Sequence, residues 1–295
     1  KKNQNGGGAI SHSENSRNTS TQNKTIITNC VFSADSEGGE GAQSCSTFTD
    51  GGAIWTRAKE VEINNCTMDG CTANNNGGGI YLSKNGTQNA AISGIKEGET
   101  IKGSITGCQA VSGSAVYVGD SATFSGDLSV TGNNVTGANG GAIQTSDAAT
   151  TQPADARKLY FEGDVKVENN TSSADTVNDH DVLMQINGNT IINTTENGLG
   201  SGAHIGVYVP GVDGDDFYGK HGKYSQPFGT YHNSTAGTNF LDAFFNNRDS
   251  ELYGYQGDDA FIHWGFYVCK ITDADGNTLK RTNGRDAVYQ QLSQL

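Results

Sequence analysis

One tetrapeptide recurs along this chain and limits the folds that the chain can adopt. Two small residues, usually glycines, precede a branched apolar residue, and the pattern returns at irregular intervals. Its copies are Gly7-Gly8-Ala9-Ile10, Gly51-Gly52-Ala53-Ile54, Gly78-Gly79-Ile80-Tyr81, Gly113-Ser114-Ala115-Val116 and Gly140-Gly141-Ala142-Ile143. A short repeated unit cannot bury its apolar face alone and has to stack on its neighbours. The repeat therefore predicts a solenoid.

Each copy is typical of a tight corner followed by a short strand. Glycine adopts positive φ without strain and lets two backbones approach closely. Side chains then alternate inward and outward along the strand. We expect one inward stack of Ile10, Ile54, Ile80, Val116 and Ile143, with His12, Thr56, Leu82, Val118 and Thr145 two positions later on the same face.

A second pattern lies between these copies and predicts another wall. An apolar residue is followed two positions later by Asn or Gly, and then by Cys or Asn; the apolar members are Ile27, Ile63, Ile105, Val130 and Val167. We expect these side chains to stack on one another, and the asparagines at the following corner to form a ladder. The two walls together predict a right-handed parallel β-helix over residues 1–193.

Composition supports an all-β chain and limits its partners. The 295 residues include 41 glycines, and only 17% are charged. Glycine and small polar residues disfavour helices, and the low charge argues against a disordered chain. The net charge of −13 argues against nucleic acid and anionic membranes as partners. No apolar run reaches the length of a membrane span, so we expect no membrane insertion.

The repeated tetrapeptides and asparagine-rich turns resemble the repeats of polymorphic outer-membrane proteins and of large adhesins of Gram-positive gut bacteria. The resemblance covers approximately residues 1–193. Such proteins are generally non-catalytic surface structures, so the resemblance implies an adhesin at a bacterial cell surface. We also expect the chain to be a segment of a longer protein, because it carries no recognisable signal peptide or anchor motif.

The pattern changes after residue 193. Residues 194–265 contain apolar and aromatic stretches that are typical of strands, and the open end of a β-helix needs a cover. We therefore expect a β-rich cap over residues 194–265. Residues 266–295 are expected to form a hairpin around Asp273-Ala274-Asp275-Gly276 and then to begin a following module with a helix-like stretch.

The outward positions between the inward rows suggest a ligand-binding surface. They are occupied by Ser11, Trp55, Tyr81, Tyr117 and Gln144. Neighbouring coils lie about 4.8 Å apart, so the three aromatic residues should form an exposed strip. Aromatic rings with polar edges suit sugars, and we expect Trp55, Tyr81 and Tyr117 to bind an extracellular glycan or glycoprotein. An aromatic ladder packed beneath an insertion is the alternative interpretation.

Acidic residues supply the candidates for a metal site and for catalysis. Asp213, Asp215 and Asp216 lie within one glycine-containing stretch and are candidate calcium ligands, with a solvated acidic loop as the alternative. Otherwise we expect no cofactor. Asp215, Asp216 and His221 loosely resemble the acidic pair and histidine of polygalacturonase-type glycoside hydrolases. Because His221 follows the acidic pair too closely for that pattern, we expect no catalytic residue.

The cysteines give a weaker pattern. Cys30, Cys66 and Cys108 occupy equivalent places in the second repeat, whereas Cys45 and Cys71 are expected on corner insertions. We expect mostly free thiols, although a surface protein also permits disulfides.

Three functions follow from these features. The first is a non-catalytic adhesin segment that binds glycans through one face of the solenoid. The second is a β-helical polysaccharide lyase or glycoside hydrolase, and the third is a structural stalk without a ligand.

Overall fold

The computed structural model describes most of the chain up to residue 208 and several short strands beyond it. The described residues are 7–13, 23–34, 45–83, 89–94, 103–146, 157–176, 179–183, 190–208, 229–230, 243–247, 252–256, 261–266, 268–270 and 288–290. All the named elements in these ranges are strands. The prediction of an all-β chain is thus confirmed.

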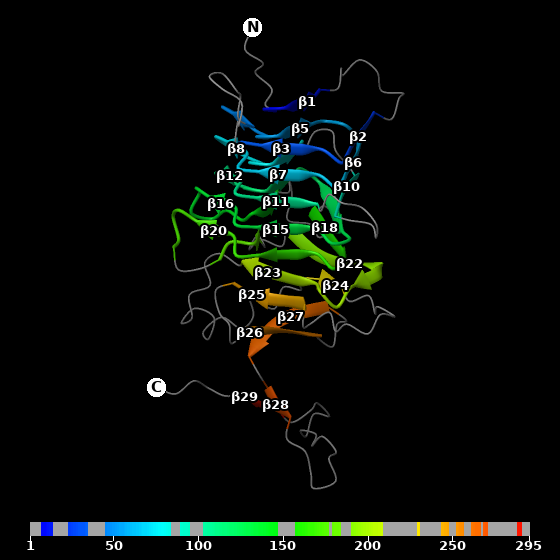
Figure 1. The fold of residues 1–295 in the computed structure, drawn as a ribbon. Coiled ribbons are helices and arrows are strands. Elements are labelled where there is room, and N and C mark those ends of the chain that lie inside the picture. Colours follow the sequence, from blue (N-terminus) through cyan, green and yellow to red (C-terminus); the bar gives the residue numbers. More distant parts are fainter. Residues whose placement is uncertain are drawn as a thin grey trace.

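The first sheet contains two parallel series of strands that meet at β23 (Figure 1). One series contains β1 (Ile10–His12), β5 (Ile54–Thr56), β9 (Ile80–Leu82), β13 (Val116–Val118), β17 (Ile143–Thr145) and β21 (Val182–Leu183). The other contains β3 (Val31–Ser33), β7 (Thr67–Asp69), β11 (Ser104–Thr106), β15 (Ser129–Thr131) and β19 (Lys166–Glu168). Both series pair with β23 (His204–Tyr208), which also pairs with β25 (Phe244–Asn246).

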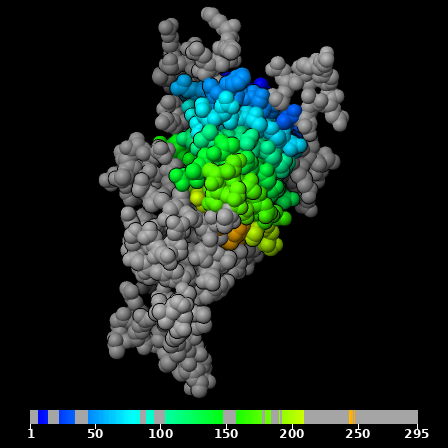
Figure 2. All heavy atoms as spheres, turned by 90° about the vertical axis from the view of Figure 1, so that its left-hand side faces the viewer, coloured from blue at the N-terminus to red at the C-terminus, as the bar shows by residue number. Residues whose placement is uncertain are grey.

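Two further parallel sheets complete each coil. The longer one contains β2 (Lys24–Thr28), β6 (Glu60–Asn64), β10 (Asn89–Ser93), β14 (Ser121–Ser125), β18 (Arg157–Gly163) and β22 (Thr190–Leu199). The shorter one contains β4 (Ser46–Thr47), β8 (Thr72–Ala73), β12 (Gln109–Ala110), β16 (Asn134–Val135) and β20 (Thr171–Ser172). From β1 to β19, each strand pairs with the strand four places further along the chain. Successive coils therefore stack in chain order, as Figures 1 and 2 show from two sides.

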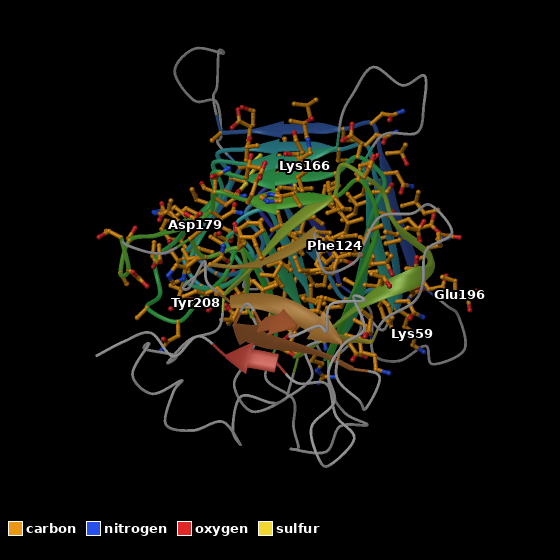
Figure 3. The ribbon with its side chains drawn as sticks, turned by 90° about the horizontal axis from the view of Figure 1, so that it is seen from below. Lys59, Phe124, Lys166, Asp179, Glu196 and Tyr208 are labelled. Carbon is orange, nitrogen blue, oxygen red and sulfur yellow. The ribbon has the colours of Figure 1, made fainter. Side chains whose placement is uncertain are left out.

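The first expected inward row is confirmed. Ile54, Ile80, Val116 and Ile143 are fully buried and pair in register on consecutive strands, while Ile10 in the first coil is half-buried. Viewed along the stack, Phe124 lies inside the outline of the coils, whereas Lys59 and Glu196 lie at its outer edge (Figure 3). The apolar core therefore runs along the inside of the stack.

The second expected row is wrong as a single stack. Ile27 and Ile63 stack with Ile92 on the sheet that contains β2 and β6. Ile105 stacks instead with Met68 and Val130 in the first sheet, and Val130 continues to Val167. The five residues belong to two walls because one turn sequence is used at two corners of the coil.

Each of the two corners contains a residue with a left-handed backbone conformation. Asn29 and Asn65 have φ values of 57° and 51° at the corner between β2 and β3 and its equivalent in the next coil. Gly107, Gly132 and Asn169 have φ values of 62°, 65° and 57° at the corner that follows β11, β15 and β19. Asn and Gly tolerate this conformation best, so the two corners look alike in sequence.

The expected positions of the cysteines are wrong for the same reason, namely that one sequence pattern occurs at two corners. Cys30 and Cys66 follow the first of these corners, whereas Cys71 and Cys108 follow the second. The strands that begin immediately after Cys45, Cys71 and Cys108 pair in register. Cys108 therefore stacks with Cys71 and Cys45, and the latter two are not on insertions.

Glycine is required at the start of the first-wall strands for two reasons. Gly51 has a φ of 73°, which a residue with a Cβ rarely adopts. A Cβ on Gly52 would clash with the Gly78 carbonyl of the next coil. The tetrapeptide therefore both turns the chain and allows the coils to approach.

The stacked coils extend past the expected boundary at residue 193, which falls inside β22. Parallel pairing continues through β23 to β25. An antiparallel sheet of β24 (Gly229–Thr230), β27 (Phe261–Phe266) and β26 (Leu252–Gln256) follows, with β24 against β22 and β26 against β25. This sheet lies at the end of the stack opposite β1 (Figure 1).

The last pair of strands differs from the expected hairpin. β28 (Val268–Lys270) pairs antiparallel with β29 (Val288–Gln290). β29 lies in the stretch that was expected to be helix-like. The turn expected at residues 273–276 lies outside the described residues.

Candidate functional site: a stacked aromatic row

The candidate site lies on the outer side of the first wall. The central residues of β5, β9 and β13 are Trp55, Tyr81 and Tyr117, and they pair in register. Ser11 of β1 and Gln144 of β17 continue the row at its two ends. We call Trp55, Tyr81 and Tyr117 the aromatic row. Its formation from consecutive coils agrees with the expected placement.

The rings of the aromatic row stack on one another. The centroids of Trp55 and Tyr81 are 6.3 Å apart with an interplanar angle of 8°. Those of Tyr81 and Tyr117 are 5.3 Å apart at 10°. In-register parallel strands bring identical positions one coil apart, which places neighbouring rings face to face. The facing surfaces of the rings are therefore covered by the neighbouring rings.

The expectation of an exposed strip is wrong for Trp55 and holds only in part for the two tyrosines. Trp55 is only 6% exposed, whereas Tyr81 and Tyr117 are half-buried. Ring faces that stack on each other leave mainly ring edges and polar substituents for contact with solvent. The accessible part of the row is thus its tyrosine portion.

Charged groups act on the centre of the row. Burial raises the pKa of the Tyr81 hydroxyl above its usual value, and the negative charge of Asp50 adds to this rise, whereas Arg57 opposes it. The hydroxyl therefore stays protonated at neutral pH and can donate a hydrogen bond. Asp50 is held in place because its Oδ1 accepts hydrogen bonds from the backbone N–H of Asn76 at 3.1 Å and from its Nδ2 at 2.9 Å.

The acidic candidates cannot be located in the same way. Asp213, Asp215, Asp216 and His221 lie outside the described residues. Within the ranges that the structure describes, no group of three or more His, Cys, Asp or Glu side chains is arranged to hold a metal ion. The expected calcium site therefore stays a prediction.

A buried polar ladder at the second corner extends beyond what the sequence indicated. Asn133 Nδ2 donates to Asn170 Oδ1 at 2.8 Å, and Asn170 Nδ2 donates to Asp181 Oδ1 at 2.6 Å. The two asparagines confirm the expected ladder. Asp181 was missed because it follows Asn170 at an irregular spacing and replaces the amide by a carboxyl group.

The end of this ladder is electrostatically unusual. Asp181 is completely buried, and burial raises the pKa of its carboxyl group to about 6, even though hydrogen bonds from Asn170 and Asn247 favour the charged form. Asp181 Oδ2 accepts a hydrogen bond from Asn247 Nδ2 at 2.8 Å. The carboxyl group thus joins the last coils to the segment that carries β25, and its burial keeps it from contact with substrate.

Comparison with known proteins leaves function to be argued from this geometry. No family model, no curated protein and no solved structure matches the chain. Among the residues described above, no helix is long and apolar enough to cross a membrane. The aromatic row is consequently the feature on which a functional proposal rests.

Proposed function

We propose that this chain is a non-catalytic segment of a bacterial cell-surface adhesin, and that it binds extracellular glycans or glycoproteins through the aromatic row. The in-register stack of Trp55, Tyr81 and Tyr117 carries this proposal. Aromatic side chains with polar tips are suited to ligands that are apolar on one side and hydrated on the other. The outer face of a stacked solenoid is also a frequent binding surface.

We further propose that the stacked coils form a right-handed parallel β-helix. Each strand from β1 to β19 pairs in parallel with the strand four places further on, which requires the chain to cross over between neighbours in each sheet. Crossover connections between parallel strands of one sheet are right-handed in about 98% of cases.

The stacking determines the mode of binding that we propose. Because the rings cover one another, a glycan meets the edges and hydroxyl groups of Tyr81 and Tyr117. Coils repeat about every 4.8 Å, so a linear glycan lying along the stack can contact both tyrosines at once. The Tyr81 hydroxyl donates to a sugar oxygen, and Asp50 and Arg57 provide a polar rim.

The test is affinity electrophoresis of the full chain through native gels that contain mucin or a plant polysaccharide. A variant with Tyr81→Phe and Tyr117→Phe keeps the ring stack and removes both hydroxyls. Each hydroxyl contact is worth about 1 kcal/mol, so removing both weakens binding by about 2 kcal/mol, or roughly 30-fold, and we expect retardation to be largely lost. Tyr160→Phe is the matched control, because Tyr160 is a half-buried tyrosine on the outer side of a different sheet.

The outcomes separate the three functions. Retardation that is lost in the double variant and kept in the control supports the proposal. Retardation that is unchanged in the folded double variant refutes the role of the aromatic row. Shortened or unsaturated glycan products after incubation would instead assign a polysaccharide-cleaving enzyme.

A structural stalk is the second candidate, and one observation favours it. Trp55 is buried and its ring stacks on Tyr81, which is also what a purely stabilising ladder would do. If no glycan retards the chain and the double tyrosine variant behaves as the parent does, the stalk is the better account.

A further inference from the structure

Two thiols stand directly above one another on the first two coils. Thr28 pairs with Asn64 just before them, and Val31 pairs with Thr67 just after them. The register is therefore the same on both sides of the corner, which places Cys30 opposite Cys66. The backbone confirms this, because the N–H of Thr67 donates to the carbonyl oxygen of Cys30 at 2.9 Å.

The spacing of the coils suits a covalent link between these thiols. Neighbouring strands lie about 4.8 Å apart, and disulfides form between residues whose Cα atoms are roughly 4.4–6.8 Å apart. Both cysteines are free in this structure. Each thiol also donates to a carbonyl of its own coil at 3.4 Å, from Cys30 to Thr28 and from Cys66 to Asn64. The two side chains are thus held in similar orientations.

Accessibility distinguishes Cys30 from Cys45, Cys66, Cys71 and Cys108. Cys30 is half-buried, whereas Cys66 is 4% exposed. The stack of Cys45, Cys71 and Cys108 at the other corner is buried throughout, and burial raises the pKa of Cys45 to about 12. Burial also raises the pKa of the Cys66 thiol. Thiol exchange needs an accessible thiolate. Of Cys30, Cys45, Cys66, Cys71 and Cys108, Cys30 is therefore the one that an external reagent can reach first.

We propose that Cys30 and Cys66 are a modification site at which a small disulfide, such as oxidised glutathione, joins the first two coils through an intramolecular disulfide bond. The Cys30 thiolate attacks one sulfur of the small disulfide, forms a mixed disulfide and releases one thiolate. The Cys66 thiolate then attacks the Cys30 sulfur, forms the Cys30–Cys66 bond and releases the second thiolate. The two protons lost by the cysteines pass to the two released thiolates, and the small disulfide is reduced to two thiols.

The link has a mechanical consequence that does not depend on glycan binding. The disulfide closes a loop from Cys30, just before β3, to Cys66, just before β7. β3 and β7 are neighbouring paired strands. Closing a loop of this kind restricts the unfolded chain and raises the temperature of unfolding. A covalent link between neighbouring coils also keeps them together when hydrogen bonds between the coils open locally.

Peptide mapping of the full chain tests the proposal. The folded protein is treated with oxidised glutathione, alkylated, and digested with an endoproteinase that cleaves before aspartate. Cleavage before Asp35, Asp50 and Asp69 separates Cys30, Cys45 and Cys66 into different peptides, which span residues 1–34, 35–49 and 50–68. We expect peptides 1–34 and 50–68 to be joined, with the loss of two hydrogen atoms, and to separate after reduction.

Three variants control the assignment. Cys30→Ser and Cys66→Ser should each abolish the joined peptides, whereas Cys45→Ser should retain them. The oxidised parent should unfold at a temperature higher by roughly 5–15 °C than the reduced parent, and oxidised Cys30→Ser should show no such shift. Recovery of Cys66 as an alkylated thiol from the oxidised parent would overturn the proposal. So would a glutathione adduct that persists on Cys30, or a link from Cys30 to another cysteine.

Discussion

Replacing Asp181 by asparagine should remove a pH dependence of stability that this carboxyl group creates. Asp181 Oδ1 accepts hydrogen bonds from Asn170 N at 3.1 Å and from Asn170 Nδ2 at 2.6 Å. An asparagine has the same shape and keeps both bonds through its oxygen. Its Nδ2 group would face Asn247 Nδ2, so the bond from Asn247 to Oδ2 is lost, while Asn247 Oδ1 still accepts from the backbone N–H of residue 181 at 3.3 Å. The substitution therefore removes the charge and one side-chain hydrogen bond without changing the shape of the side chain.

The magnitude follows from the shift in pKa. Burial raises the pKa of Asp181 to about 6, whereas an aspartate in an unfolded chain has a pKa of about 3.9. The folded state thus binds this proton more tightly than the unfolded state does. The resulting stabilisation is fully present below about pH 4 and is lost as the pH rises through about 6. The difference between the folded and unfolded pKa values corresponds to about 3 kcal/mol in the free energy of unfolding.

The assay is urea unfolding of the parent and of Asp181→Asn, followed by circular dichroism from about pH 4 to about pH 8. We expect the parent to lose up to about 3 kcal/mol relative to the variant across this range, and the variant to be the more stable one above about pH 7. Asp127→Asn, at an exposed carboxylate, is the control and should follow the parent. If the parent and Asp181→Asn show the same pH dependence, the carboxyl group is not protonated preferentially in the fold and the reasoning is wrong.

Three other perturbations test the packing. Phe161→Ala removes a fully buried ring whose centroid lies 5.4 Å from that of Phe124, and urea unfolding should show a loss of about 3–5 kcal/mol; a loss below about 1 kcal/mol would contradict the buried stack. Gly52→Ala should lower the Tm more than Gly132→Ala, because a Cβ at Gly52 meets backbone of the next coil, whereas one at Gly132 meets no atom within 4 Å and costs only about 1–2 kcal/mol for alanine at a φ of 65°; equal Tm values would refute this. Because burial raises the pKa of Cys45 to about 12, mass spectrometry should show its alkylation by iodoacetamide only after unfolding, and rapid alkylation in the folded protein would show that the thiol is accessible.

The repeated tetrapeptide predicted the first wall because its information is local. A left-handed glycine such as Gly51 and an inward Ile54 three residues later both belong to one short segment. The in-register aromatic row follows from the same alignment, since Trp55 and Tyr81 each come one residue after the inward isoleucine. The aromatic row itself was therefore predictable from the sequence, whereas its role as a binding site stays a prediction.

The exposure of the site could not be predicted in the same way. Whether Trp55 is reached by solvent depends on what packs around it and on the ring orientation that stacking imposes. Tyr81 and Tyr117 remain half-buried, although they occupy the same position on neighbouring coils. A strand pattern predicts that a side chain points outward, but it carries no information about how much of that side chain remains uncovered.

The sequence by itself determined the local elements: corners at glycine and asparagine, short strands after them, and side chains that alternate between the two faces. Only the tertiary structure decided which corners stack. Ile63-Asn64-Asn65-Cys66 and Ile105-Thr106-Gly107-Cys108 have the same local pattern and lie at different corners. Both corners need a left-handed residue, which selects Asn or Gly in each case. The register between coils depends instead on hydrogen bonds and core contacts between residues far apart in the chain, so the repeat alone does not specify it.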